Sequence, residues 1–268
     1  MSGTESGGGD AERALELARA LDAAADWLGG ADPASGWGGA RLPREYHVGD
    51  FALPSASPGE AGESGIDLEA DRAAVSACEL CRLGATRRRA AYGEGSPRPL
   101  VLVVGEGPGA EEDAQGRPFV GPAGKLLDRM LQAVNLSRDT NCYIANIVKC
   151  RPPNNRDPAG DEKEACLPWL ERQIEALRPL VILALGRVAA ATLLGTEEGI
   201  GRLRGRWFER RGIPLIATYH PSALLRDEAM KRPAWEDLKT LRYRLDDLLA
   251  VPGDGGAARG TDGAPGVN

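Results

Sequence analysis

The chain has 268 residues, of which 42% are hydrophobic and 27% charged, and its formal net charge is −6. This length suits one sizeable α/β domain with appended segments, and no apolar run comes close to the roughly 20 residues that a membrane helix needs. The first residues also lack the basic start and apolar core of a signal peptide. We therefore expect a cytoplasmic protein with no membrane partner.

The charge is divided unevenly along the chain. Residues 1–75 carry 14 acidic and 5 basic side chains, whereas residues 76–250 carry 23 acidic and 27 basic ones. We expect residues 1–75 to form an acidic, low-complexity extension with one amphipathic helix from about Asp10 to Leu28. Residues 76–250 then form the folded domain, and the Gly-rich residues 251–268 form a disordered tail.

From residue 99 onward, short apolar runs alternate with amphipathic segments. This pattern predicts strands near residues 100–104, 142–148, 180–185, 207–210 and 214–218, and helices near residues 122–134, 161–177, 187–194 and 233–249. Such alternation is typical of a mostly parallel sheet with helices on both faces. Ligands of these folds bind beyond the carboxyl ends of the strands.

Three of the predicted strands are followed by loops with side chains suited to binding. The loop Gly105–Gly121 is rich in glycine, but its spacing matches neither the dinucleotide fingerprint nor the Walker loop. Asn146 begins the second loop, and its amide is either a satisfied structural group or the reader of a planar ligand. His220 lies in the third loop, where it is either a structural histidine or part of a strand-end site. No Gly-x-Ser-x-Gly elbow is present, which argues against a serine hydrolase.

Four of the five cysteines form two separated pairs. Cys78 and Cys81 make a Cys-x-x-Cys turn, whereas Cys150 and Cys166 come from distant segments. In a reducing compartment such cysteines indicate metal ligation rather than disulfides. Their spacing alone is compatible with zinc and with an iron-sulfur cluster. Cys142 lies in an apolar run and is expected to be a buried spectator.

A clump of basic residues follows the first cysteine pair. It is compatible with phosphate contacts and equally with a solvated charge run, and it comprises Arg82, Arg87, Arg88, Arg89 and Arg98.

Several of these motifs, in this order, resemble the iron-sulfur (family 4) uracil-DNA glycosylases over about residues 76–248. The resemblance rests on Cys78-x-x-Cys81, Gly105-Glu-Gly-Pro-Gly-Ala-Glu-Glu-Asp113, Gly116-Arg-Pro-Phe-Val-Gly121, Asn146-Ile-Val-Lys-Cys150-Arg-Pro-Pro-Asn-Asn-Arg156, Cys166 and His220-Pro-Ser222. It implies a structural [4Fe-4S] cluster on Cys78, Cys81, Cys150 and Cys166. It also implies a three-layer α/β/α fold around a four-stranded parallel sheet.

The activity that the resemblance implies is hydrolysis of the N-glycosidic bond of a flipped-out deoxyuridine, which initiates base excision repair. The substrate is uracil-containing DNA, single- or double-stranded, and the protein is expected to be a monomer that associates with the nucleoid when it acts on DNA. Phe119 would stack on the uracil, Asn146 would read its O4 and N3–H edge, and His220 would donate a hydrogen bond to O2.

The resemblance also places Glu106, Gly107 and Glu112 in the pocket. Glu106 or backbone groups of the first loop would hold the water, because Gly107 stands where family 1 enzymes place an aspartate. Glu112 is expected to crowd the methyl group of thymine.

DNA contacts are expected on two segments. Leu224, Leu225 and Arg226 either enter the duplex and hold its backbone or form an amphipathic turn on the core. The other segment lies beside the second cysteine pair and offers phosphate contacts through Lys149, Arg151 and Arg156.

Two alternatives to a glycosylase are open. A uracil-DNA-binding relative forms a covalent adduct through a histidine in an inserted basic loop, but no histidine lies between Phe119 and His220. The second alternative is a catalytically weak uracil-DNA or nucleic-acid-binding protein on the same fold.

Overall fold

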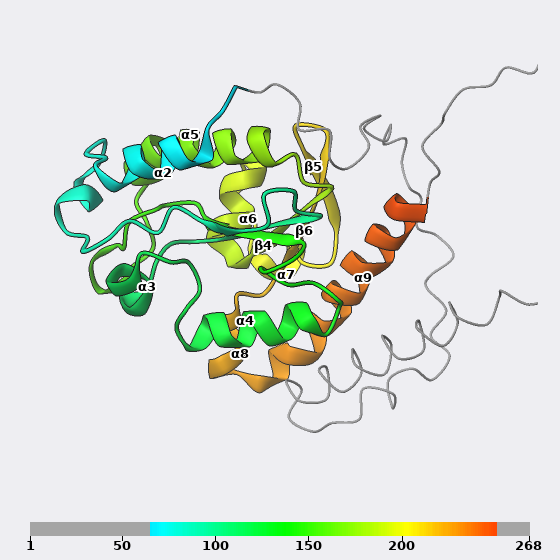
Figure 1. Cartoon of the computed structure of the whole chain (residues 1–268). Helices are drawn as coiled ribbons and strands as arrows, with labels where there is room; N and C mark the ends of the chain where they lie inside the picture. The colour runs from blue at the N-terminus through cyan, green and yellow to red at the C-terminus, as the bar shows by residue number, and fades with distance from the viewer. Residues whose placement is uncertain (1–64, 251–268) are drawn as a thin grey trace, which may run out of the picture.

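The computed structural model describes residues 65–250 (Figure 1). The helix expected from Asp10 to Leu28, most of the linker after it and the tail expected at residues 251–268 lie outside the described residues. The first described helix, α2 (Leu68–Ser76), packs against α5 (Gly160–Leu177). The described fold therefore begins within the segment 1–75. Among the described helices, none combines the length and the apolarity that crossing a membrane requires.

The centre of the described fold is a six-stranded sheet with the strand order β1-β3-β2-β4-β6-β5. The strands are β1 (Glu94–Gly95), β2 (Val101–Gly105), β3 (Cys142–Asn146), β4 (Val181–Leu185), β5 (Trp207–Arg210) and β6 (Ile213–Thr218). The inner strands β3, β2, β4 and β6 run parallel, and the edge strands β1 and β5 are antiparallel to their neighbours. The predicted four-stranded parallel sheet thus forms the centre, and two antiparallel edge strands extend it.

Helices cover both faces of the sheet because the inner strands are apolar on both faces. Val101 and Val103 belong to the core shared with α4 (Pro122–Gln132), α8 (Pro221–Arg226) and α9 (Lys231–Ala250). Leu102 and Val104 belong to the core shared with α5 and α6 (Gly186–Leu194). The predicted three-layer α/β/α fold is therefore confirmed (Figure 1). The short elements are α3 (Ala110–Gln115), α7 (Ile200–Leu203), η2 (Arg82–Ala85), η3 (Pro153–Asn155) and η4 (Glu228–Met230).

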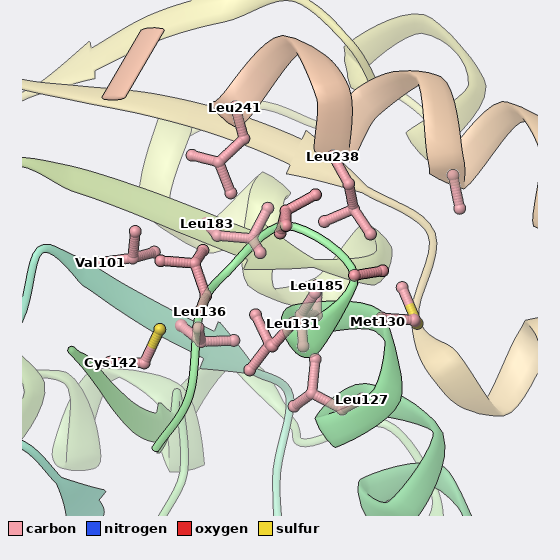
Figure 2. Packing of buried hydrophobic residues seen from close by; sticks show 14 of the residues in the cluster. Val101, Leu127, Met130, Leu131, Leu136, Cys142, Leu183, Leu185, Leu238 and Leu241 are labelled. Carbon is pink, nitrogen blue, oxygen red and sulfur yellow. The ribbon is translucent and has the colours of Figure 1, made fainter. Parts of the chain in front are cut away.

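A large apolar cluster lies beneath α4 and α9 (Figure 2). Leu127, Met130 and Leu131 of α4 follow helical spacing and gather with Leu238 of α9 around β4. Cys142 lies in this same core with no exposed surface. It is therefore a buried core residue, as its apolar sequence context predicts.

The parallel register brings three strand ends to one edge of the sheet. Gly105 ends β2 and lies opposite Asn146, which ends β3. Thr218 ends β6, two residues before His220. Beyond Asn146, the N–H group of Ile147 donates to the Gly105 carbonyl at 2.9 Å, so the chain after β3 stays against the first loop. The three loops expected to carry the site thus start from neighbouring points.

The short helix α8 corrects one expectation about DNA contacts. Leu224 is fully buried in the core against α4, so it is not available to enter a duplex. The next residue, Leu225, is 47% exposed, and Arg226 is exposed as well. Packing of α8 on α4 selects which of the two adjacent leucines points inward.

Replacing Leu224 by alanine is expected to lower the free energy of unfolding by about 2 to 5 kcal/mol, because it removes buried methyl groups and leaves a cavity. The matched control Leu225→Ala is expected to change it by less than about 0.5 kcal/mol. Urea denaturation of both variants at equal iron content measures the difference. Similar losses in the two variants would contradict the assignment of Leu224 to the core.

Candidate active site and cysteine-lined cavity

An aromatic ring, an amide and an imidazole meet at the carboxyl edge of the sheet. The rings of Phe119 and His220 lie with their centroids 5.5 Å apart at an interplanar angle of 31°. Both the ring of Phe119 and the amide of Asn146 touch the backbone of Gly105. A Cβ atom at Gly105 would lie 2.4 Å from Asn146 Oδ1 and 2.5 Å from Phe119 Cζ, so only glycine fits there.

The side chain of Asn146 is buried with one polar atom unsatisfied. Asn146 is 1% exposed, and among the described residues its Oδ1 atom has no hydrogen-bond partner. An unpaired buried acceptor costs about 1 to 3 kcal/mol. Of the two sequence-based interpretations of Asn146, this favours a reader of a ligand over a satisfied structural amide.

Phe119 is held in a strained backbone conformation. Its φ angle is 53°, in the left-handed region, which a bulky residue adopts at a cost of about 1 to 3 kcal/mol. Arg138 Nη2 donates to the Phe119 carbonyl at 2.9 Å, and Nη1 donates to the Pro118 carbonyl at 3.0 Å. Gly124 leaves room for this backbone, since a Cβ atom there would lie 1.9 Å from Phe119 O. The orientation of the Phe119 ring is thus set by its surroundings.

Glu112 ties the two halves of the first loop together. Its Oε1 atom accepts from the N–H groups of Val120 and Gly121, each at 2.9 Å, and Oε2 accepts from the N–H group of Gly109 at 3.1 Å. These bonds to uncharged backbone groups hold the segment that carries Phe119. The expected contact of Glu112 with a pyrimidine methyl group stays a prediction.

The imidazole of His220 has a defined tautomer. His220 precedes α8, and its Nδ1 atom accepts from the N–H group of Ser222 at 3.2 Å. A backbone N–H only donates, so Nδ1 carries no proton and the neutral ring carries it on Nε2. Burial lowers the pKa of His220 to about 4, helped by the charge of Arg226 and opposed by that of Glu112. At neutral pH the ring is therefore an uncharged Nε2–H donor.

Glu106 is the first residue of the loop that follows β2. The pKa of Glu106 is raised to about 7, mainly by burial and then by the charge of Asp157, against opposing effects of Arg187 and Lys163. Asp157 and Arg187 form an ion pair that the sequence did not indicate. Glu106 is therefore a carboxyl group that can gain or lose a proton near neutral pH.

Gly107 packs tightly against the segment that follows β3. A Cβ atom at Gly107 would lie 2.7 Å from Val148 Cγ2. The glycine thus allows the first loop and the cysteine-bearing segment to pack directly on each other.

The four cysteines expected to act as ligands line one cavity. Its other lining residues are Val75, Leu80, Gly84, Arg87, Lys149, Ala165 and Trp169. The cysteines come from the end of α2, the turn before η2, the segment after β3 and α5, so the cavity joins parts of the chain that are far apart in sequence.

Two of the cysteine sulfurs each have a nitrogen donor beside them. The N–H group of Lys149 donates to Cys166 Sγ at 3.3 Å, and Arg87 Nη1 lies 3.5 Å from Cys150 Sγ. The same Arg87 atom donates to the Cys78 carbonyl at 2.7 Å. Arg87 therefore belongs to the wall of the cavity, which fits neither of the two interpretations of the basic clump, a phosphate contact or a solvated charge.

The donor set is that of a thiolate site. Four thiols line one cavity, and nitrogen donors lie beside two of them. Thiolates of this number hold zinc and iron-sulfur clusters alike. Within residues 65–250, no group of three or more Cys, His, Asp or Glu side chains is already arranged to hold a metal ion.

Further expected phosphate contacts need correction. Lys149 is fully buried and donates to the Asn146 carbonyl at 2.9 Å and to Gln173 Oε1 at 2.6 Å, so it cannot reach DNA. Arg82 and Arg156 are exposed but share the carboxylate of Glu162. Three basic residues of these two segments are exposed and have no side-chain partner among the described residues. They are Arg88, Arg89 and Arg98. Arg151 is partly exposed and donates to Asn155.

The fold is a three-layer α/β/α fold in which an aromatic ring, an amide and an imidazole meet at one edge of the sheet. The model of the Uracil DNA glycosylase superfamily matches residues 92–239, and the chain belongs to this superfamily.

Individual relatives show which types of uracil-DNA glycosylase the chain is similar to. The Type-4 uracil-DNA glycosylase of Saccharolobus solfataricus is 40% identical over 207 residues, which cover 71% of this chain and 94% of the relative. The Type-4 enzyme of Thermotoga maritima is 43% identical over 171 residues, 62% of this chain and 88% of the relative. The Type-5 uracil-DNA glycosylase of Pyrobaculum aerophilum is 35% identical over 141 residues, 46% of this chain and 62% of the relative. The resemblance to family 4 is thus confirmed.

The protonation state of His220 can be measured by NMR. The chain has two histidines, so the His47→Gln variant leaves His220 as the only imidazole signal. We expect the His220 ring to stay neutral from pH 8 down to about pH 5, because burial holds its pKa at about 4. Its nitrogen chemical shifts should be those of the Nε2–H tautomer throughout this range. A midpoint near 6.5, the ordinary histidine value, would contradict this description.

Proposed function

We propose that this protein hydrolyses the N-glycosidic bond between uracil and deoxyribose in DNA and so initiates base excision repair. The observation that carries the proposal is the unpaired, buried Oδ1 atom of Asn146 beside the ring of Phe119 and near the imidazole of His220. Membership of the Uracil DNA glycosylase superfamily and relatives named Type-4 uracil-DNA glycosylases support the same reaction.

Recognition begins with a flipped-out base. Extruding a nucleotide from a duplex costs a few kcal/mol, and stacking on an aromatic ring offsets about 1 to 3 kcal/mol of this. Phe119 supplies that ring. Asn146 then accepts from the uracil N3–H through Oδ1 and donates to O4 through Nδ2. Cytosine presents an acceptor and a donor in the reverse order, so the same amide leaves both groups unpaired and rejects it.

Bond cleavage moves an electron pair onto the base. The C1′–N1 bond breaks, its electrons pass to the uracil ring, and a water oxygen bonds to C1′. The water gives up one proton to solvent and the uracil anion takes one up, so that the products are free uracil and an abasic sugar. The Nε2–H group of His220 donates to uracil O2, where negative charge grows during this step. Because this hydrogen bond strengthens as the charge develops, it stabilises the transition state more than the bound substrate.

Glu106 is the proposed partner of the attacking water. Its pKa of about 7 leaves a substantial ionised fraction at neutral pH. An ionised carboxylate accepts a hydrogen bond from water and stabilises the positive charge that develops on the sugar. Backbone groups around Gly107 are the alternative holders of this water. A carboxylate here needs only to orient the water, since the departing sugar is already strongly electrophilic.

The proposed cofactor is a [4Fe-4S] cluster held by Cys78, Cys81, Cys150 and Cys166. When bound, it would act as a structural crosslink and take no part in hydrolysis. The cavity lined by all four cysteines and the N–H donors to Cys150 and Cys166 support this assignment.

The proposed partner is uracil-containing DNA, bound by a monomer in the cytoplasm. Leu225 and Arg226 are exposed on α8, directly after His220, and are suited to fill the space left by the base and to contact a phosphate. Arg88 and Arg89 add exposed positive charge beside α3. Binding is therefore expected to weaken as salt concentration rises. The proposed catalytic domain is residues 76–250 together with α2 (Leu68–Ser76), which packs against α5, and the rest of the chain on either side is appended to it.

Excision assays test the function. Wild-type protein incubated with a uracil-containing oligonucleotide, followed by alkali, is expected to give strand cleavage. His220→Ala should slow it by about 100-fold to 1,000-fold, as loss of one transition-state donor does, with the iron content unchanged. His47→Ala, which alters the other histidine of the chain, serves as the control. Uncleaved DNA that stays tightly bound to the wild type would favour the alternative of a uracil-DNA-binding protein.

The cluster is tested separately through its ligands. Cys166→Ser is expected to abolish the brown absorbance and most of the bound iron and to reduce solubility, because metal binding is coupled to folding of the segments that carry the ligands. Cys142→Ala, which lies outside the cavity, should retain full iron content. A colourless Cys166→Ser protein with full stability and activity would refute the assignment.

A further inference from the structure

A buried lysine lies directly behind the proposed base-reading amide. Lys149 has no exposed surface, and its Nζ atom donates to the backbone carbonyl of Asn146 at 2.9 Å and to Gln173 Oε1 at 2.6 Å. The same Nζ atom lies 5.7 Å from the centroid of the Tyr92 ring. Within the described part of the chain, Lys149 forms no ion pair. Both Nζ hydrogen bonds thus go to neutral oxygen acceptors, while Lys149 also lines the cysteine cavity.

Such an arrangement needs an explanation beyond packing. A buried ammonium carries a large desolvation penalty, which hydrogen bonds and neighbouring negative charge offset only in part. A methionine of similar length fills the same space without this penalty. The lysine therefore does something in this position that an apolar side chain of equal size does not.

The carbonyl that Lys149 binds belongs to the last residue of β3. The peptide after Asn146 is held on one side by the Ile147 N–H group, which donates to the Gly105 carbonyl at 2.9 Å, and on the other side by the Asn146 carbonyl, which accepts from Lys149 Nζ. The side chain of Asn146 projects from the same residue into a narrow space above Gly105. A side chain at position 105 would fill this space, since even a Cβ atom there would lie 2.4 Å from Asn146 Oδ1. A small rotation of the backbone at Asn146 would move Oδ1 out of line with a bound base.

Lys149 also joins this residue to helix α5. Its N–H group donates to Cys166 Sγ, and its Nζ atom donates to Gln173, seven residues further along the same helix. Gln173 is itself fixed, since its Nε2 atom donates to the Tyr92 carbonyl at 3.0 Å. A rigid helix that carries one of the cysteines thus holds both ends of Lys149.

We propose that Lys149 is a positioning residue, which fixes the backbone of Asn146 from helix α5 so that the unpaired Oδ1 atom points at the base. The role rests on the proposed function, because it assigns Lys149 to base reading in that same site. It acts through Asn146 and makes no contact with DNA. Since the link to Cys166 uses the backbone N–H, replacing the side chain separates this role from the wall of the cysteine cavity.

A double-mutant cycle tests the proposal. Lys149→Met is expected to lower kcat/KM for uracil excision by tenfold or more in the wild-type background, and by less than twofold in the Asn146→Ala background, because its effect passes through Asn146. Iron content should be unchanged. The control Lys239→Met, which removes an ion pair on α9, should leave kcat/KM unaltered. Equal fold-losses in both backgrounds would overturn the proposal while leaving the proposed function intact.

A second readout does not depend on turnover. The side-chain amide NMR signal of Asn146, identified by its absence in Asn146→Ala, is expected to shift in Lys149→Met and not in Lys239→Met. An unmoved signal would overturn the proposal even if the wild type excised no uracil. Should Lys149→Met fail to fold, Gln173→Met removes an acceptor of Nζ and leaves the lysine in place. Gln173→Met should also shift the Asn146 amide signal, and its effect on kcat/KM should also be smaller in the Asn146→Ala background. Absence of either effect would count against the role of Lys149.

Discussion

The close approach of Phe119 and Asn146 over the bare backbone of Gly105 is the contact on which the site depends. The parallel register places Gly105 opposite Asn146 at the sheet edge, and the absence of a Cβ atom lets the ring and the amide occupy the same small space. His220 completes the arrangement from β6, with its ring 5.5 Å from that of Phe119. Three segments distant in sequence become one site because parallel strands end together.

This site is held in a state that the isolated segments would not choose. Phe119 has a positive φ angle and Asn146 leaves a buried acceptor unpaired, each at a cost of about 1 to 3 kcal/mol. Surrounding groups over-determine this geometry: Arg138 binds the Phe119 carbonyl, Glu112 binds the N–H groups that follow it, and Lys149 binds the Asn146 carbonyl. Groups fixed before binding lose little freedom when a base arrives, and this is how such preorganisation raises affinity and rate.

The sequence predicts the fold well, because apolar runs and helical periodicity report burial directly. It misses β1, whose two residues, Glu94 and Gly95, carry no strand pattern. Motif order brought Phe119, Asn146 and His220 into one hypothesis, and the structure brings the three side chains together. The wrong predictions for Lys149 and Leu224, and the role of Arg87 that neither sequence interpretation gave, have one physical origin. From sequence alone a charged residue is expected to be exposed, and either of two adjacent leucines can face inward. Tertiary contacts bury Lys149 against Gln173, turn Arg87 toward Cys78 and turn Leu224 toward α4, and the sequence does not show these contacts. Arg138 gave no signal, because only the tertiary fold brings it to its partners, the carboxylates of Glu94 and Asp128 and the carbonyls of Pro118 and Phe119.

The central claim is that these three side chains grip one extruded pyrimidine. A crystal structure with an oligonucleotide containing 2′-fluoro-2′-deoxyuridine tests it most directly, because the fluorine disfavours positive charge on the sugar and preserves the bond. The account predicts a uracil ring stacked on Phe119, with Asn146 Oδ1 at N3 and His220 Nε2 at O2, each within about 3 Å. A base bound elsewhere, or one left stacked in the DNA with these three side chains untouched, would contradict it.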